Sequence, residues 1–308
     1  TSILYRRDMA YTQERLGDVY LAMGDVAAAE QAFALSLKIT EELVAELPGD
    51  DATERDLSVS YERNGDTRVA NGDYQGALES YAKALVIREE FAARDPANTL
   101  RQRDLSVTYE RIGDTNNLLG DTESALLAQQ AAAAIRERLA ALDPTNMLWQ
   151  RDLSVSYERL GDLYLAQNDL VAALEQQERA RVLREAIVSL EPQNLPRQRD
   201  LGVTLEKIAA LKLSMGDAAG AETLWIEVTN LRQSLVTADP VVSQYRMDLA
   251  YSLGQLSGLF VTQGRYDSSD LRLAADPDVF SRFMITAQRD GKTGGQAIAT
   301  GGLGGFLG

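Results

Sequence analysis

The stretch RDLSVSYERNGD, residues 55–66, decides the fold because it returns along the chain at a fixed spacing. RDLSVTYERIGD occupies 103–114 and RDLSVSYERLGD occupies 151–162, so consecutive copies begin 48 residues apart. Weaker copies lie at 7–18, 199–210 and 247–258. Five of the seven prolines follow the same period: Pro48, Pro96, Pro144, Pro192 and Pro240. Such regularity predicts an array of stacked structural repeats.

Each period contains two helical patterns. In the fourth period, four large residues share one helix face: Leu153, Tyr157, Leu160 and Tyr164. A pair such as Gly72-Asp73 then interrupts the pattern, because Gly is favoured just past a helix end and Asp at the cap of the next helix. The second pattern stops at Asp95-Pro96, since a proline disfavours helix in the residue before it. No segment alternates with a period of two, so we predict an all-α chain with helices of about 20 residues, each about 30 Å long.

The repeated Arg-Asp pairs lie near the start of each first helix. They include Arg55-Asp56, Arg103-Asp104 and Arg151-Asp152. A negative charge in the first turn suits the helix dipole. We therefore predict that these pairs begin the first helices and cap them.

Composition excludes several classes of function. The chain of 308 residues is 45% hydrophobic and 25% charged, which is typical of a folded protein. Its net charge of −15 argues against binding to a nucleic-acid backbone. Histidine and cysteine are both absent, which removes His- and Cys-based nucleophiles, zinc fingers and thiol redox chemistry. We predict no cofactor, no metal and, without a long apolar stretch, no membrane span.

The repeat residues resemble those of the tetratricopeptide-repeat family over roughly residues 1–265. In the second period the matching positions are Tyr61, Gly65, Gly72, Ala77, Tyr81 and Ala84, and in the first they are Gly17, Tyr20, Gly24, Ala29 and Phe33. The period is 48 residues, whereas the family's usual period is about 34. The resemblance implies a right-handed α-solenoid of about six antiparallel helical hairpins. Long-period arrays of this kind resemble those of bacterial multidomain proteins, where they accompany a signalling or effector domain.

We expect three regions along the chain. Residues 1–265 form the repeat array, 266–290 form degenerate capping helices interrupted at Asp276-Pro277, and 291–308 form a Gly-rich tail with 8 Gly in 18 residues. The chain opens at a repeat boundary, so we expect more protein upstream. This start leaves Ile3, Leu4 and Tyr5 open to solvent, which makes a homo-oligomer plausible.

The resemblance implies that first-helix residues line a concave groove where a peptide or protein binds. The candidate residues are Glu14, Asp18, Glu62, Arg63, Asp66, Val69, Glu110, Arg111, Asp114, Asn117, Glu158, Arg159, Asp162, Leu165, Glu206 and Leu213. One interpretation is a partly acidic groove for a segment that carries Lys or Arg. In the family's well-known version, groove Lys, Asn and Arg bind the C-terminal carboxylate of a peptide, and we do not expect this binding here because the matching positions hold Glu and Asp. The other interpretation is a ladder in which Arg of one repeat pairs with Glu or Asp of the next. Specificity would then come from the positions that vary, namely Val69, Asn117, Leu165 and Leu213, with Arg68, Asn116 and Tyr164 beside them.

Three functions follow from these patterns. The first is a non-catalytic, cytoplasmic scaffold for protein–protein interaction. The second is the sensor or regulatory repeat region of a larger bacterial signalling protein. The third is a helical-toroid glycosidase with two carboxylates as acid and base, which would need a substrate cleft lined with aromatics, whereas the chain has only Trp149 and Trp225 as tryptophans.

Overall fold

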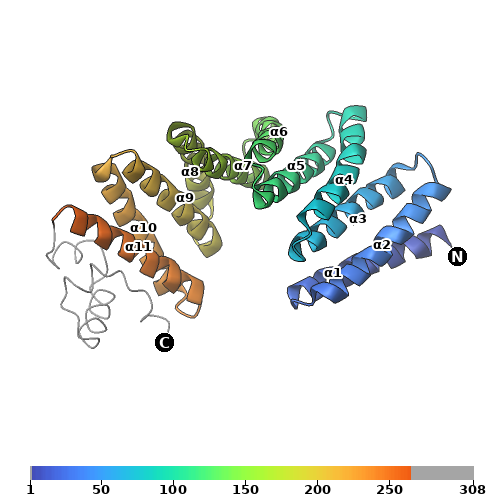
Figure 1. Cartoon of the computed structure of the whole chain (residues 1–308), viewed down its shortest axis with the longest axis horizontal. Coiled ribbons are helices and arrows are strands. Elements are labelled where there is room, and N and C mark those ends of the chain that lie inside the picture. Colours follow the sequence, from blue (N-terminus) through green and yellow to red (C-terminus); the bar gives the residue numbers. More distant parts are fainter. Residues whose placement is uncertain (1, 265–308) are drawn as a thin grey trace. The chain divides into compact units, whose positions relative to one another are not determined.

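A computed structural model describes residues 2–264 of the chain. In this part every regular element is an α-helix, as the sequence predicts, and the helices follow one another as consecutive hairpins (Figure 1). The chain divides into two compact units, Thr1–Gln167 and Asn168–Gly308, called unit 1 and unit 2 below. The capping helices expected at 266–290 and the tail at 291–308 lie outside the described residues.

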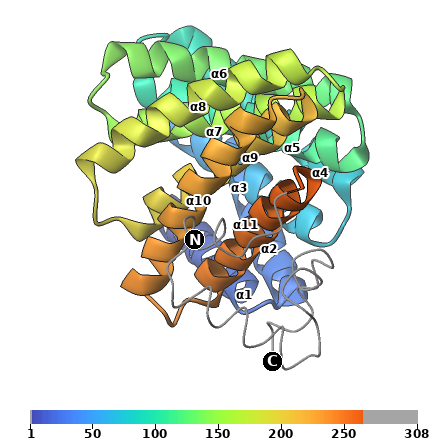
Figure 2. The ribbon, with the colours of Figure 1, turned by 90° about the vertical axis from the view of Figure 1, so that its left-hand side faces the viewer.

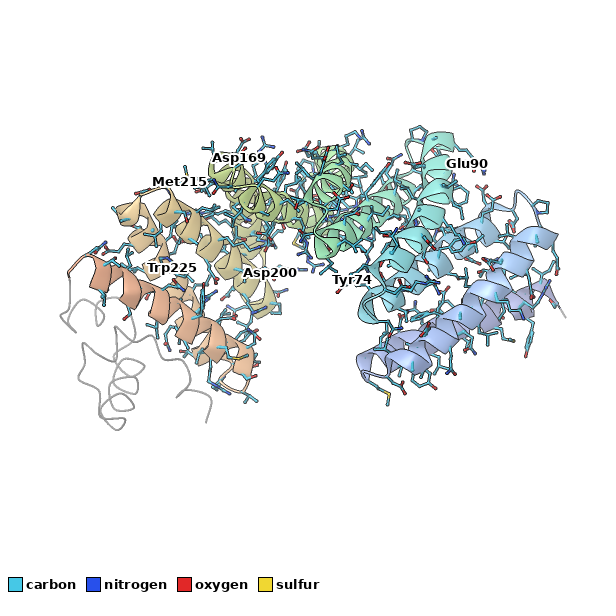
Figure 3. The ribbon with its side chains drawn as sticks, in the orientation of Figure 1. Tyr74, Glu90, Asp169, Asp200, Met215 and Trp225 are labelled. Carbon is cyan, nitrogen blue, oxygen red and sulfur yellow. The ribbon has the colours of Figure 1, made fainter. Side chains whose placement is uncertain are left out.

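Unit 1 contains three helical hairpins and one further helix. The hairpins are α1 (Ile3–Ala22) with α2 (Val26–Glu46), α3 (Asp51–Ala70) with α4 (Tyr74–Arg94), and α5 (Thr99–Leu119) with α6 (Thr122–Leu142), followed by α7 (Met147–Ala166). Each helix packs against the next along the chain. Every helix is 20 or 21 residues long, which matches the predicted length. Tyr74 and Glu90, labelled in Figure 3, lie near opposite ends of α4.

Unit 2 continues with α8 (Leu170–Leu190), α9 (Leu195–Ser214), α10 (Ala218–Ala238) and α11 (Ser243–Thr262). Its helices also contact their neighbours in chain order, and Figure 2 shows α9, α10 and α11 following one another. The core of this unit is built around Trp225 of α10 (Figure 3), whose ring meets that of Tyr251 edge-on with centroids 6.1 Å apart. Such edge contacts add to the stabilisation from burial.

The turns inside the hairpins form as the sequence predicts. Gly72 has φ of +77°, a conformation that suits glycine, and Asp73 caps α4 by accepting a hydrogen bond from the Gly76 amide at 3.0 Å. The same cap recurs at Asp25, Asp121, Asp169 and Asp217. In the fourth period Asn168 takes the left-handed position with φ of +61°.

The first helices begin earlier than predicted. Asn98 caps α5 and Asn146 caps α7, several residues before the Arg-Asp pairs. The prediction that Arg55-Asp56 and its equivalents start and cap these helices is therefore wrong. Their physical role is to join repeats, because Arg7 pairs with Asp56 and Arg103 with Asp152, at 2.8 and 2.7 Å.

In the first two hairpins a glycine of the first helix receives an aromatic side chain from the second helix. Tyr81 of α4 and Gly65 of α3 are both buried, and a Cβ on Gly65 would lie 2.4 Å from the Tyr81 ring. Gly17 and Phe33 pack in the same way in the first hairpin. The close approach of the two helices in these hairpins therefore depends on the absence of a side chain.

Candidate functional site

The charged candidates of the first helices form two rows. The glutamate row consists of Glu14, Glu62, Glu110, Glu158 and Glu206, and the aspartate row consists of Asp18, Asp66, Asp114 and Asp162. Members of the two rows are four residues apart within each repeat and so share a helix face. The structure gives the two rows different partners.

The glutamate row faces arginines of the second helices. Arg88 of α4, only 5% exposed, donates to Glu62 at 2.7 Å. Arg136 pairs with Glu110 in the next repeat, and Arg232 pairs with Glu206 in unit 2. These carboxylates therefore have their counter-charge inside the chain.

The same arginines reach into the next repeat. Arg136 donates to the backbone carbonyl of Asp152 at 3.1 Å and to the Ser156 hydroxyl at 2.9 Å. Arg184 makes the equivalent contact with the carbonyl of Asp200, which Figure 3 labels on α9. We call Arg88, Arg136, Arg184 and Arg232 the bridging arginines. Their charge-assisted bonds fix how one repeat sits on the next.

Glu14 is the exception in the glutamate row. The position equivalent to a bridging arginine holds Thr40, and Glu14, 7% exposed, makes no ion pair among the described residues. Its Oε1 accepts hydrogen bonds from Ser60 at 2.9 Å and Ser36 at 3.2 Å. Burial raises the pKa of Glu14, and these hydroxyl bonds only partly oppose it.

The aspartate row forms a ladder between repeats in unit 1. Three of these aspartates meet an arginine of the following first helix: Asp18 meets Arg63 at 3.7 Å, Asp66 meets Arg111 at 3.3 Å and Asp114 meets Arg159 at 3.3 Å. Ion pairs between repeats therefore exist, but their direction is opposite to the predicted ladder, because each arginine reaches back to the aspartate of the preceding repeat. Burial raises the pKa of both Asp66 and Asp114, while the facing arginines oppose the rise.

A pocket of about 260 Å³ opens where the third repeat meets α7. Four candidates from the sequence line it: Asp114, Asn117, Arg159 and Asp162. Gly113, Leu118, Leu163 and the amide side chain of Gln129 complete its lining. Gln129 stands where the first two repeats have the aromatic residues Phe33 and Tyr81. Its Nε2 still donates to Asp114 at 2.9 Å, as the Tyr81 hydroxyl does to Asp66 at 2.8 Å.

The variable positions are mostly on the surface. Asn117 is exposed, Leu165 and Leu213 are 46% and 42% exposed, and Val69 is half-buried. Their neighbours are held by local contacts, since Arg68 pairs with Asp73 at 3.2 Å and the Tyr164 hydroxyl accepts from Gln130. Asn116 is buried at 8% exposure. Of the variable positions and their neighbours, only Asn117 lines the pocket at α5–α7.

Two features of the site were not among the sequence predictions. The bridging arginines follow the 48-residue period, and this spacing was the available signal for them. The change from an aromatic residue to Gln129 was the available signal for the pocket.

Neither tryptophan lines the pocket at α5–α7. Trp225 is 2% exposed, and Trp149 is partly buried and packs against a hydrophobic cluster. Within residues 2–264 no group of three or more acidic side chains is arranged to hold a metal ion. None of the helices described there is long and apolar enough to cross a membrane.

Comparison with known proteins agrees with this geometry. A sequence model described as a tetratricopeptide repeat matches residues 10–43, which cover the later part of α1, the turn and most of α2. The chain has the tetratricopeptide-repeat fold. This fold is generally non-catalytic and serves in protein interaction. No curated protein sequence matches the chain.

Solved structures with the same fold are distant in sequence. BtubC (BKLC) from P. vanneervenii is 20% identical with a TM-score of 0.60, over 76% of this chain and 88% of that one. A putative kinesin light chain from Podosopora anserina is 17% identical with a TM-score of 0.56, over 75% and 97%. A signal transduction ATPase with numerous domains (STAND) and a tetratricopeptide repeat sensor, from Pyrococcus horikoshii, is 15% identical with a TM-score of 0.62. That similarity covers 93% of this chain and 38% of the ATPase.

Proposed function

We propose that the chain is a non-catalytic interaction module that binds a segment of another protein over the first helices of unit 1. The observation that supports this most strongly is the pocket at α5–α7, which collects charged, amide and apolar groups from two repeats. Its volume of about 260 Å³ suits one or two side chains of a partner better than a drug-sized ligand.

The chemistry of the pocket favours a partner with both apolar and basic residues. Leu118 is 53% exposed at its edge and offers a surface for an apolar side chain. The carboxylates of the aspartate row, together with a net charge of −15, favour the approach of a positively charged segment. The arginines of the ladder hold these carboxylates in place, so a partner would find them already ordered.

Photo-crosslinking followed by affinity measurement tests this proposal. A photoreactive residue at Asn117 is expected to capture a partner in cells, whereas one at Val86, 65% exposed on α4, is not. The purified partner should then bind the Leu118→Glu variant about tenfold more weakly and the control Val86→Glu variant unchanged. Equal capture at both positions, or equal affinity for both variants, would contradict the proposal.

A second candidate is a sensor region within a larger protein. It is favoured by the similarity to the STAND ATPase, whose sensor carries the same fold over 93% of this chain. In this case binding at the first-helix face would change the activity of another domain. The test uses the product of the full reading frame. The activity of any additional domain is measured with and without the partner, and an unchanged activity would contradict this candidate.

A further inference from the structure

A second pocket, of about 510 Å³, opens at the other end of unit 1, between α1, α2 and α3. It is distinct from the pocket at α5–α7, because its lining comes from the first repeat and the start of the second. Glu14, the buried carboxylate without an ion pair, is part of its wall. A buried carboxylate beside an open pocket is an unusual combination, since burial of an unpaired charge is costly.

The second repeat shows what occupies the equivalent space. There the guanidinium of Arg88 meets four acceptors: Glu62 at 2.7 Å, the carbonyl of Asp104 at 2.9 Å, Thr108 at 2.6 Å and Ser58 at 3.5 Å. One side chain of α4 thus bonds to α3 and to α5 at once. The third and fifth repeats repeat this arrangement with Arg136 and Arg232.

The first repeat keeps three of the four acceptors without the arginine. Going back 48 positions, Thr40 replaces Arg88, Glu14 replaces Glu62, Asp56 replaces Asp104 and Ala10 replaces Ser58. All four of these residues line the pocket. Ser60, the equivalent of Thr108, donates to Glu14. The pocket is therefore the space that a bridging arginine fills in the later repeats.

We infer that the pocket between α1, α2 and α3 binds the guanidinium of an arginine side chain supplied by another polypeptide. The short side chain of Thr40 carries no positive charge, so the second helix of this repeat cannot supply the group itself. A guanidinium presents several donors in a rigid fork and can reach the Glu14 carboxylate and the Asp56 carbonyl together. The ammonium group of lysine lacks this fork.

The arginines already lining the pocket do not prevent this. Each is paired with an aspartate: Arg7 with Asp56, Arg15 with Asp18 and Arg55 with Asp104. The equivalent arginines of the second repeat are Arg55, Arg63 and Arg103, and the guanidinium of Arg88 binds to Glu62 in their presence. Asp8 also lines the pocket and, among the described residues, has no ion pair of its own. The balance of groups that remain unpaired is thus acidic.

The inference is tested on the full chain by NMR titration with N-acetyl-arginine methylamide. Its neutral isostere, the citrulline derivative, is the matched ligand. The arginine derivative should shift the amide signals of Ala10 and Thr40 in a saturable way, and the citrulline derivative should bind about tenfold more weakly because it lacks the charge. Equal responses to the two ligands would overturn the inference.

Variants of the pocket provide the second arm. Thr40→Arg supplies the missing guanidinium from within the chain, so it should abolish binding of the arginine derivative. Gln31→Arg adds the same charge at an exposed position of α2 and should leave binding intact. Glu14→Gln should abolish binding without filling the pocket. Retained binding in both the Thr40→Arg and Glu14→Gln variants would contradict the inference. Because the probe is a single capped residue, its failure leaves the crosslinking test at Asn117 unaffected, and the reverse also holds.

Discussion

Arg88 holds the Glu62 carboxylate at 2.7 Å while both side chains are largely enclosed, with exposures of 5% and 13%. The pair joins the two helices of one hairpin, and the same guanidinium bonds to the hairpin that follows. A group that is placed in this way contributes both to the fold of a repeat and to the stacking of repeats.

The Arg88→Thr variant recreates in the second repeat the composition of the first. It should lower the free energy of unfolding by about 3 kcal/mol, because it leaves a buried carboxylate without its partner. The control is Arg94→Ala, which removes the ion pairs of a 39% exposed side chain with Asp51, Glu54 and Glu90 and should cost less than about 1 kcal/mol. Urea denaturation followed by circular dichroism measures both. Similar losses of unfolding free energy in the two variants would show that the Arg88–Glu62 pair contributes no more than an exposed ion pair.

The stability of the chain should fall with rising pH through the titration of Glu14. Burial raises the pKa of Glu14 from 4.5, Asp56 adds to the rise, and Ser60, Ser36 and Arg63 oppose it. The folded chain therefore holds this proton more tightly than the unfolded chain, so the stabilisation present below pH 4.5 is lost as the pH rises to the folded-state pKa. Glu14→Gln removes this dependence.

The measurement is the difference in melting temperature between the Glu14→Gln variant and the parent chain from pH 4 to 7. The melting temperature of the variant should rise relative to that of the parent as the pH increases. The other buried carboxylates are present in both proteins, so their titration cancels in the difference. A difference that stays constant over this range would mean that the Glu14 carboxyl keeps its ordinary pKa.

Gly65→Ala should destabilise unit 1. The new Cβ would lie 2.4 Å from the Tyr81 ring, and both positions are buried, so the two helices must separate. We expect a loss of about 1–3 kcal/mol. Gly258→Ala is the matched control, because no atom lies within 4 Å of that Cβ on α11 and the substitution should be neutral or stabilising. Thermal unfolding of both variants decides the point.

Gln129→Tyr should close the pocket at α5–α7 without unfolding the chain. The first two repeats carry an aromatic side chain at this position, and Tyr81 makes the same bond to Asp66 that Gln129 makes to Asp114. Partner affinity should fall about tenfold if the pocket receives a partner side chain. A variant that folds with an unchanged melting temperature and full affinity would place the partner elsewhere.

The sequence predicts the elements of the fold well because its repeat signals are local. Gly72-Asp73 ends one helix and caps the next through their own backbone and side chain, and Asp95-Pro96 stops a helix in the same way. The prediction for the starts of the first helices is wrong because Arg55-Asp56, although conspicuous, lies inside α3. The caps are Asp50, Asn98 and Asn146, which keep the 48-residue spacing but lie outside the repeated string.

The site is harder to predict because its partners come from different helices. Glu62 is visible in the repeated string, but its burial against Arg88 depends on how α3, α4 and α5 pack, which helical periodicity alone does not determine. Comparison across repeats carries more information than any single repeat. The replacement of an arginine by Thr40 at one position of the period is the residue-level signal for the second pocket.

Thr40, in place of a bridging arginine, leaves the junction between the first and second hairpins weaker than the later junctions. Between α2 and α3 the buried polar contacts are the Ser36–Ser60 hydrogen bond and the bonds of both hydroxyls to one oxygen of Glu14 on α1, whereas the bridging arginines reinforce the later junctions with charge-assisted bonds. Local opening should therefore begin with the first hairpin, whose amides would exchange with solvent hydrogen before those of α4 and α5. An arginine received from outside would close this junction, so occupancy of one small pocket would determine how firmly the first hairpin is held.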